Sequence, residues 1–185
     1  AQPIVSTSYS EPIETITSNV IGTTNILEAL KISNHKCSSI ITTSDKAYDN
    51  VEQVWGYKED DKMGGKDIYS GSKGAAELII KSYYNSFFKN ENSNVKLAIA
   101  RAGNVIGGGD WAKDRIVVDC MKSWSKGEIV EIRAPKATRP WQHVLEPLSG
   151  YLNLLMELYK NENLSGEAFN FGPRAEQNHT VEDLL

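Results

Sequence analysis

The feature that most constrains the fold of this chain is an alternation of long amphipathic segments with short apolar ones. Apolar residues recur at three- and four-residue steps over 11–33, and this spacing predicts an amphipathic helix that Ser10 and Pro12 suit as a start. The β-branched segment 38–43 then predicts a short buried strand. Further helices are predicted over 69–89, 115–126 and 147–160, and further strands over 95–100, 129–133 and 168–171.

Helices of this length between short apolar strands predict an α/β fold with a parallel sheet covered on both faces. In such sheets ligands bind beyond the carboxyl ends of the strands. We therefore expect the catalytic residues in the two segments that come directly after Thr43 and after Ala100, and both of these segments are rich in polar residues. At the other end of the chain, Thr180 and Asp183 have the spacing of a capping box that opens a helix.

Tyr69 and Lys73 form a Tyr-x-x-x-Lys element at the start of a predicted helix. A four-residue step places both side chains on one helical face. A lysine ammonium favours phenolate over phenol, so we expect a lowered tyrosine pKa and a general base that removes a hydroxyl proton as hydride leaves the same carbon. Most such pairs are solvated helix positions, but this one follows a strand that ends in Thr-Ser-Asp, which favours the catalytic interpretation.

Ser44, Asp45 and Lys46 stand where that strand ends, 25 residues before Tyr69. A hydroxyl, a carboxyl and an amine in sequence offer a hydrogen-bond donor, an acid and a base. The alternative interpretation is a turn with a local contact between Asp45 and Lys46.

Composition limits the other classes of function. A net charge of −4 and a pI near 5.5 argue against nucleic acid as the main partner. No apolar run approaches the ~18 residues that span a bilayer. Cys37 and Cys120 lack a Cys-x-x-Cys spacing and read as reduced thiols of a cytoplasmic protein. His35, His143 and His179 lie far apart in sequence, so we expect no metal site.

Five segments together resemble the extended short-chain dehydrogenase/reductase family and, within it, the 4,6-dehydratases that act on CDP-glucose. The resemblance extends over almost the whole chain, and the segments after Arg101 and Arg139 are the most specific. The segments are Ser44-Asp-Lys-Ala-Tyr-Asp, Val54-Trp-Gly-Tyr, Tyr69-Ser-Gly-Ser-Lys-Gly-Ala-Ala-Glu77, Arg101-Ala-Gly-Asn-Val-Ile-Gly-Gly-Gly-Asp-Trp111 and Arg139-Pro-Trp-Gln-His-Val-Leu-Glu-Pro147.

The resemblance implies NAD as the cofactor and CDP-glucose, converted to CDP-4-keto-6-deoxyglucose, as the substrate. Tyr69, helped by Lys73 and Ser44, would remove the proton of the sugar 4-hydroxyl as hydride leaves C4. A neutral Lys46 would then remove the C5 proton, and a protonated Asp45 would donate to the departing 6-hydroxyl. Such a pair needs a dry, coupled site. Many relatives carry Glu at the position of Lys46.

The resemblance also implies which residues hold the ligands. Ala102 would join Tyr69 and Lys73 against the cofactor. Arginine suits a diphosphate because its planar fork bonds two oxygens at once, although any single arginine here is equally explained as a solvated surface charge. The expected substrate-binding residues are Asn104, Arg115, Arg133, Arg139 and Arg174.

The fold expected from the resemblance is part of a doubly wound, Rossmann-like sheet with part of a smaller C-terminal substrate lobe. We expect residues 1–114 to belong to the NAD-binding catalytic domain and 115–185 to form a mixed region that contributes the lobe. No Gly-x-x-Gly-x-x-Gly or Gly-x-Gly-x-x-Gly phosphate loop occurs. We therefore expect a chain truncated at both ends and inactive by itself.

Two alternatives stay open. The Asp45–Lys46 pair argues against a simple 4-epimerase, which needs no acid and base for water loss, but dehydratases of UDP-N-acetylhexosamines can share it. A dehydratase or epimerase of another nucleotide sugar is therefore one alternative. The other is a non-catalytic fragment that only binds or assembles.

Both predicted helices 11–33 and 69–89 carry apolar residues beyond a single narrow stripe. We expect them to pack side by side and, by the resemblance, to join a second copy as a four-helix bundle in a homodimer. Tyr84 or Phe88 is expected near that interface. A thicker core within one chain is the alternative explanation.

Overall fold

A three-stranded sheet forms the centre of the computed structural model, which describes residues 1–33, 35–177 and 179–185. Its strands lie in the order β1–β2–β6 and pair in parallel, with Cys37 opposite Val95 and Ile99 opposite Ala168. The predicted parallel α/β sheet is thus confirmed. The strands are β1 (Cys37–Thr42), β2 (Val95–Ala102) and β6 (Ala168–Phe171).

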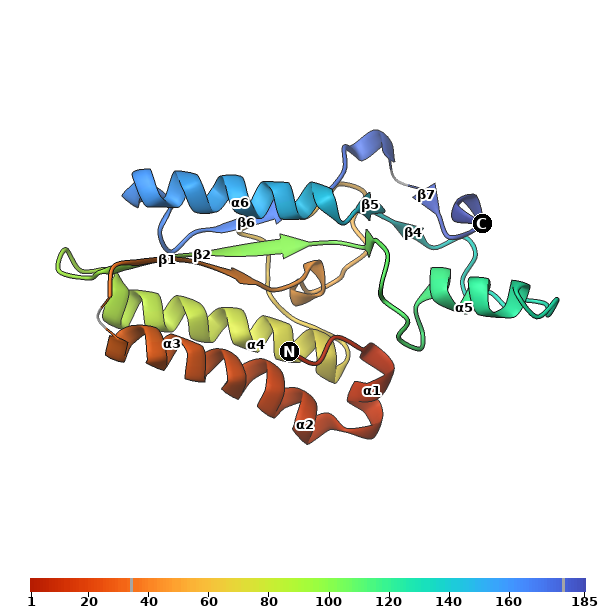
Figure 1. Cartoon of the computed structure of the whole chain (residues 1–185), viewed down its shortest axis with the longest axis horizontal. Helices are drawn as coiled ribbons and strands as arrows, with labels where there is room; N and C mark the ends of the chain where they lie inside the picture. The colour runs from red at the N-terminus through yellow and green to blue at the C-terminus, as the bar shows by residue number, and fades with distance from the viewer. Residues whose placement is uncertain (34, 178) are drawn as a thin grey trace.

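Helices cover both faces of this sheet. Helix α6 (Leu145–Lys160) lies on one face, and α3 (Gly22–Ser33) and α4 (Ile68–Tyr83) lie on the other (Figure 1). The predicted helices over 69–89 and 147–160 therefore exist, with α6 beginning two residues earlier than expected.

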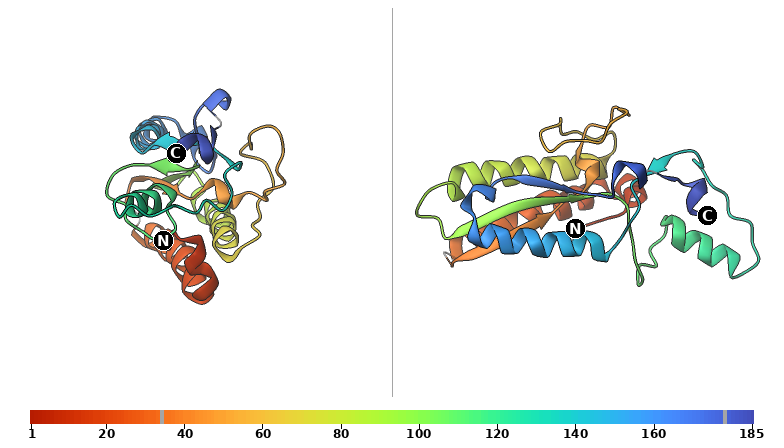
Figure 2. Two further views of the ribbon diagram at one scale, coloured as in Figure 1. Left: turned by 90° about the vertical axis from the view of Figure 1, so that its right-hand side faces the viewer. Right: turned by 90° about the horizontal axis from the view of Figure 1, so that it is seen from above.

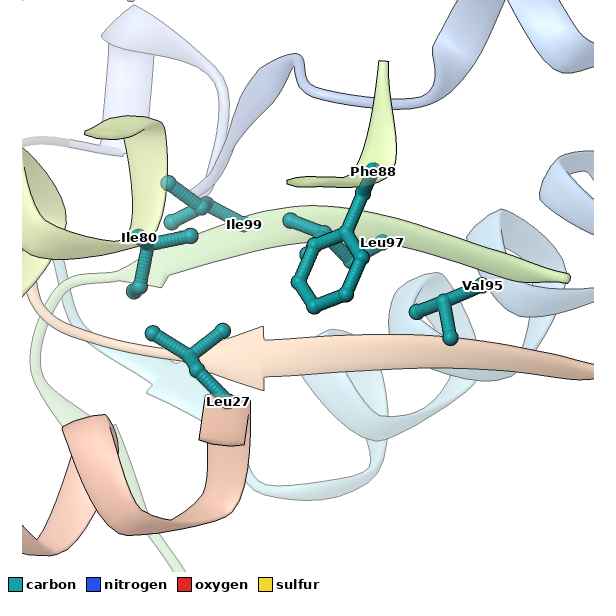
Figure 3. Close-up of a cluster of buried hydrophobic side chains, with 6 residues drawn as sticks. All are labelled: Leu27, Ile80, Phe88, Val95, Leu97 and Ile99. Carbon is teal, nitrogen blue, oxygen red and sulfur yellow. The ribbon is translucent and has the colours of Figure 1, made fainter. Parts of the chain in front are cut away.

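The side chains of β2 alternate between the two faces, as a pleated strand requires. Odd-numbered residues point to the α3–α4 side, where the buried cluster consists of Leu27, Ile80, Phe88, Val95, Leu97 and Ile99 (Figure 3). Ala98 points the other way and packs against Leu154 and Leu158 of α6. Because both faces of β2 are covered, most of its residues are apolar rather than alternating between apolar and polar.

The predicted helix over 11–33 is helical throughout but not uniform. Pro12 opens α2 (Pro12–Ile16), which passes through a π-helical segment, Thr17–Ile21, into α3. Ser10 is not the cap: it ends a separate short helix, α1 (Val5–Ser10), and its hydroxyl donates to the Thr7 carbonyl oxygen.

The apolar stripe of the predicted amphipathic helix is not buried in the first part of the helix. Leu27 is fully buried, but Ile13 is 74% exposed, and the buried residues of that part are Thr15 and Asn19. The π segment widens the hydrogen-bond step from four residues to five, so the helix presents different faces before and after it.

A second π-helical segment, Tyr84–Phe88, continues α4. Phe88 belongs to the buried cluster of the α3–α4 face, and Tyr84 packs against the same cluster. A Cβ built on Gly166 would lie 2.2 Å from the Tyr84 ring, so that ring is also held against the backbone. Phe88 is thus buried in the chain's own core and Tyr84 is half-buried against it, while their expected place near a dimer interface stays a prediction.

Several short elements from the part of the chain after β2 lie beyond the carboxyl end of the sheet (Figures 1 and 2). They are helix α5 (Ile116–Trp124), the parallel pair β3 (Val105–Ile106) and β5 (Gln142–His143), and the antiparallel pair β4 (Thr138–Arg139) and β7 (His179–Thr180).

Two expectations for this region have different outcomes. The strand predicted over 129–133 is wrong: these residues form no regular element, because no strand of the described chain pairs with them, and Ile129 is 97% exposed. The two reciprocal bonds of the expected capping box are present, since Asp183 N donates to Thr180 Oγ1 at 3.1 Å and Thr180 N donates to Asp183 Oδ2 at 2.8 Å. The element it opens is a 3₁₀ turn, Glu182–Leu184.

Candidate active site

The carboxyl end of β1 leads into a 3₁₀ turn, Asp45–Ala47, capped by Ser44. The Ser44 hydroxyl accepts from Lys46 N at 3.3 Å and donates to Asp45 Oδ1 at 3.0 Å. Serine is a favoured cap because its short side chain satisfies a free backbone N–H. The turn thus presents a hydroxyl and a carboxyl together at the edge where ligands of parallel sheets bind.

Helix α4 begins beside this turn and brings Tyr69 and Lys73 to it. Asp67 caps the helix by accepting from Ser70 N at 2.9 Å and from Ser70 Oγ at 2.7 Å. Tyr69 and Lys73 are both buried, and Lys73 Nζ lies 5.9 Å from the centroid of the Tyr69 ring.

Close contact between α4 and the turn depends on Gly74. A Cβ on this residue would lie 3.3 Å from the Ala47 carbonyl oxygen and 3.2 Å from that of Gly64. Contacts this tight on backbone atoms leave little room for a larger side chain, so glycine lets the helix and the turn approach.

The pKa of Tyr69 departs from the sequence-based expectation. Burial raises the pKa of the phenol above its ordinary value, and the charge of Asp45 raises it further. A hydrogen bond with Ser44 and the charge of Arg115 lower the pKa, but by less. The expected lowering by Lys73 is therefore wrong for this chain by itself, because desolvation of the phenolate outweighs the nearby positive charges.

Asp45 has the electrostatics of an acid. Burial raises the pKa of this carboxyl, against the Ser44 hydrogen bond and the charges of Lys46 and Arg139. A raised pKa favours the protonated form that proton donation requires. Lys46 itself is exposed, so the described residues do not provide the dry surroundings expected for it.

A buried network behind the site was not assigned a role by sequence reasoning. Glu77 accepts from Thr43 Oγ1 at 2.5 Å and forms a bidentate ion pair with Arg101, whose Nη2 lies 2.5 Å from Glu77 Oε2. The signal was present in the sequence, because Tyr69, Lys73 and Glu77 continue one four-residue spacing along α4.

Asn19 was also missed. Its amide donates to Ser72 Oγ at 2.9 Å, and Ser72 Oγ in turn donates to the Tyr69 carbonyl oxygen at 2.7 Å. Gln2 closes the other side, with its backbone N–H donating to Asn19 Oδ1 at 2.7 Å. These buried hydrogen bonds connect the π-helical segment to the first turn of α4. No short sequence motif predicts them.

The predicted arginines fall into two groups. The charges of Arg115 and Arg139 oppose the raised pKa values of Tyr69 and Asp45 respectively, each as one of the smaller contributions. Arg133 is exposed and lies 3.7 Å from Asp114, and Arg174 is exposed. No hydrogen bond or ion pair among the described residues joins Arg133 or Arg174 to the turn.

The remaining predicted residues lie on the strands and loops beside the turn. Ala102 ends β2, and Asn104 follows it, partly buried, with its carbonyl oxygen accepting from Gln142 N at 3.0 Å. His143 Nδ1 accepts from Leu145 N at 3.3 Å at the start of α6, which is a structural contact. Within the described residues no group of three potential metal ligands is found, and no helix is long and apolar enough to cross a membrane.

Comparison with known sequences decides the family. The family described as GDP-mannose 4,6 dehydratase matches residues 1–172 of the chain. The chain belongs to this family. Within it, the chain is 52% identical to the CDP-glucose 4,6-dehydratase of Salmonella typhimurium over 188 aligned residues, covering all of this chain and 52% of that protein. It is also 27% identical to the CDP-paratose 2-epimerase of Salmonella typhi, covering 92% of this chain and 55% of that protein.

Solved structures give the same fold for this dehydratase-family chain. A dTDP-glucose 4,6-dehydratase from Streptomyces venezuelae, solved with NAD bound, superposes with a TM-score of 0.82 at 15% identity, covering 100% of this chain and 52% of that one. The UDP-glucuronic acid 4-epimerase from Bacillus cereus, also with NAD, gives 0.82 at 21% identity, covering 100% and 55%. These likenesses confirm the doubly wound, Rossmann-like fold, and the sequence matches confirm the family assignment. The chain spans about half the length of the curated relatives it matches.

Proposed function

We propose that the whole protein to which this chain belongs is an NAD-dependent CDP-glucose 4,6-dehydratase. The observation that carries the proposal is the Ser44–Asp45–Lys46 turn packed against Tyr69, in a chain 52% identical to a CDP-glucose 4,6-dehydratase. An epimerase needs only the tyrosine, whereas water loss also needs an acid. The raised pKa of Asp45 supplies that acid at the right end of the sheet.

The residues divide the reaction among them. Tyr69 removes the proton of the sugar 4-hydroxyl while the hydride leaves C4. The resulting 4-ketone acidifies the C5 proton, and Lys46 takes it as the neutral amine, which requires that the bound substrate or the rest of the protein covers its exposed side chain. Asp45 protonates the 6-hydroxyl, which departs as water and leaves a C5–C6 double bond. Return of the hydride to C6 and of a proton to C5 completes the product, so no oxidant is consumed.

The residues present fit the reacting end of NAD, the group that accepts the hydride from C4 and returns it to C6. Tyr69 and Lys73 lie buried on one face of α4, and Ala102 ends the neighbouring strand β2. The three glycines 107–109 follow β3 rather than opening a helix, so they do not form the phosphate cradle of a dinucleotide site. We propose that another part of the protein holds the phosphates.

The substrate's diphosphate is assigned to the arginines beyond the sheet, and Arg139 is the strongest candidate because its charge already acts on Asp45. Asn104, Arg115, Arg133 and Arg174 complete the proposed set. Trp141 adds support: its Nε1 is buried and has no hydrogen-bond acceptor among the described residues. An indole N–H is only a donor, so a substrate oxygen or base would satisfy it.

The test is the conversion of CDP-glucose by the full-length protein, followed by mass spectrometry and by NADH absorbance. We expect loss of one water from the sugar nucleotide with no net NADH. UDP-N-acetylglucosamine is the control substrate, and its turnover with CDP-glucose untouched would overturn the substrate assignment. A product of unchanged mass would identify an epimerase instead.

The 185-residue chain by itself is proposed to be inactive, because it contains no phosphate loop for the cofactor. The division at 114/115 is likewise a proposal. It is supported by α5, β4 and β7 lying beyond the sheet, although α6 and β6, from the same C-terminal part, belong to the sheet layers. Activity of the isolated chain with NAD and CDP-glucose would contradict the first statement.

We further propose a cytoplasmic homodimer that uses the outer face of helices 11–33 and 69–89. Support comes from large apolar side chains left exposed on these helices, among them Ile13, Ile26 and Leu78. A glutamate at an apolar interface costs several kcal/mol, to order of magnitude. Light scattering of Ile13→Glu in the full-length protein should therefore report a monomer, and an unchanged dimer would contradict this interface.

A further inference from the structure

The Glu77–Arg101 ion pair lies deep behind the site, with side chains only 4% and 5% exposed. Arg101 Nε lies 2.9 Å from both Glu77 oxygens, and Arg101 Nη1 is left free to donate elsewhere. A buried ion pair adds little stability compared with an apolar pair of the same volume, so its presence calls for another explanation. One attested explanation is the fixing of a particular geometry.

The free end of Arg101 reaches the residue that follows the Asp45–Ala47 turn. Arg101 Nη1 donates to the Tyr48 hydroxyl at 2.5 Å and to the Glu59 carbonyl oxygen at 2.9 Å. The Tyr48 hydroxyl then donates to Asn170 Oδ1 at 2.7 Å. The guanidinium also lies 4.8 Å from the centroid of the Tyr48 ring.

Tyr48 is therefore held from three elements at once: α4 through Glu77 and Arg101, the β2 strand that carries Arg101, and β6 through Asn170. Its backbone is part of the catalytic turn, because Tyr48 N donates to the Asp45 carbonyl oxygen at 3.2 Å. A displacement of its ring would thus move the backbone that carries Asp45 and Lys46. Tyr69, in contrast, is carried by the first turn of α4, and no hydrogen bond among the described residues joins its side chain to Tyr48, Arg101 or Glu77.

We propose that Tyr48 is a positioning residue, whose hydroxyl, held by the Glu77–Arg101 pair, orients the Asp45–Lys46 turn for the loss of water. The inference rests on the proposed dehydratase function. It assigns the network to one of the two halves of the reaction: elimination depends on the orientation of the turn, whereas oxidation at C4 depends on Tyr69.

The experiment compares Tyr48→Phe with Tyr57→Phe in the full-length protein. Tyr48→Phe removes only the hydroxyl from a ring that is 3% exposed. Tyr57 is the matched control, because its ring stacks on Tyr48 with centroids 5.1 Å apart, yet its hydroxyl donates to Asn50 Oδ1 at 3.0 Å, outside the network.

The first measurement separates the half-reactions. In single turnovers of CDP-glucose, Tyr48→Phe should slow the elimination step about tenfold, since small misplacements of reacting groups are costly. Oxidation should stay within about twofold of the wild type, so enzyme-bound NADH should accumulate transiently. Tyr57→Phe should show neither effect. Equal slowing of both steps, or no slowing of either, would overturn the proposal.

The second measurement needs no turnover. Hydrogen exchange of the Tyr48 amide, which donates to Asp45, should be faster in Tyr48→Phe, while the Gly71 amide in α4 keeps its wild-type rate. Unchanged exchange at Tyr48 would overturn the positioning role. If the wild type does not dehydrate CDP-glucose, the proposed function and the elimination assignment both fail, and exchange alone then decides whether the hydroxyl holds the turn.

Discussion

The buried polar face of α4 and the arginine-bearing loops beyond the sheet use charge in opposite ways. On α4, Lys73 and Glu77 are buried, and Glu77 has a complete set of donors within the chain. In the loops, Arg133 and Arg174 are exposed, and Arg133 has only a 3.7 Å contact with Asp114. The two regions face the same edge of the sheet but differ in how much of their geometry the chain itself determines.

This difference follows from the cost of desolvation. A buried charge must be paired and hydrogen-bonded, so every group around Glu77 has one arrangement. An exposed arginine stays solvated and contributes little by pairing at the surface. From this comparison we expect the groups on α4 to be organised before any ligand arrives, and the proposed diphosphate site to acquire its geometry when an anion binds.

The sharpest test of the organised region is Tyr69→Phe in the full-length protein. Loss of a general base costs roughly 10²–10⁴-fold in rate, and here it also removes the acceptor of the 4-hydroxyl proton. We expect no NADH even transiently when CDP-glucose is added. Tyr9→Phe is the control, since Tyr9 is exposed and should retain full activity. Normal NADH formation by Tyr69→Phe would show that another group accepts the proton.

The next largest effect should come from Glu77→Gln, measured by urea unfolding of the full-length protein. Breaking a buried ion pair leaves Arg101 with an uncompensated charge, which costs about 3–5 kcal/mol. The matched control is Glu157→Gln, whose ion pair with Lys160 has side chains 56% and 64% exposed. That change should cost about 0.5 kcal/mol or less. Equal costs for the two variants would remove the contrast between buried and exposed charge.

A smaller contrast is expected between two glycines with positive φ, one in the turn that packs against Tyr84 and one in the loop after β3. Gly166 has φ +90° and the Tyr84 ring against it, while Gly109 has φ +91° and open space. Gly166→Ala should lower the free energy of unfolding by about 3 kcal/mol, and Gly109→Ala by about 1 kcal/mol, because only the first adds a clash to the backbone strain. Urea midpoints of the two variants measure this difference, and a reversed order would contradict it.

The smallest expected effect concerns the loops. Arg139→Lys keeps the charge but loses the fork that bonds two oxygens. We expect the KM for CDP-glucose to rise about tenfold, the cost of one lost hydrogen bond to a charged group, with kcat and stability unchanged. Arg133→Lys should have a weaker effect, because Arg133 is not among the groups that shift the pKa of Asp45 or of Tyr69. An unchanged KM for Arg139→Lys would place the diphosphate elsewhere.

Local pattern was sufficient to predict the sheet and its helices. The segments around β1, β2, α4 and β6 have the periodicity of their structure because their burial is set by near neighbours in the sheet. The segment 129–133 has a similar apolar run but no adjacent strand in the described chain, and it forms none. Strand propensity without a pairing partner does not make a strand.

The site was only partly predictable for a related reason. Ser44 and Asp45 are adjacent, and Tyr69 and Lys73 are four residues apart, so a local pattern marks each pair, and their roles stay predictions that the packed turn supports. The four-residue spacing that marks Glu77 on α4 does not reveal its partners, because the Tyr48–Arg101–Glu77 link joins residues 24 and 53 positions apart. The direction of the Tyr69 pKa was missed because burial depends on the whole fold rather than on the nearest lysine.

The π-helical segment Thr17–Ile21 also fixes the number of residues that this helix must contain. A π turn holds one residue more than an α turn, and one residue corresponds to about 100° of helix rotation. Deleting exposed Ser18 should remove this extra residue, so that an unbroken α-helix forms and the hydrogen bond between Asn19 and Ser72 is displaced. The number of residues in this helix therefore matters to the site. A relative that lacks one residue here should have different contacts at the first turn of α4, whereas a one-residue gap in a surface loop need not change them.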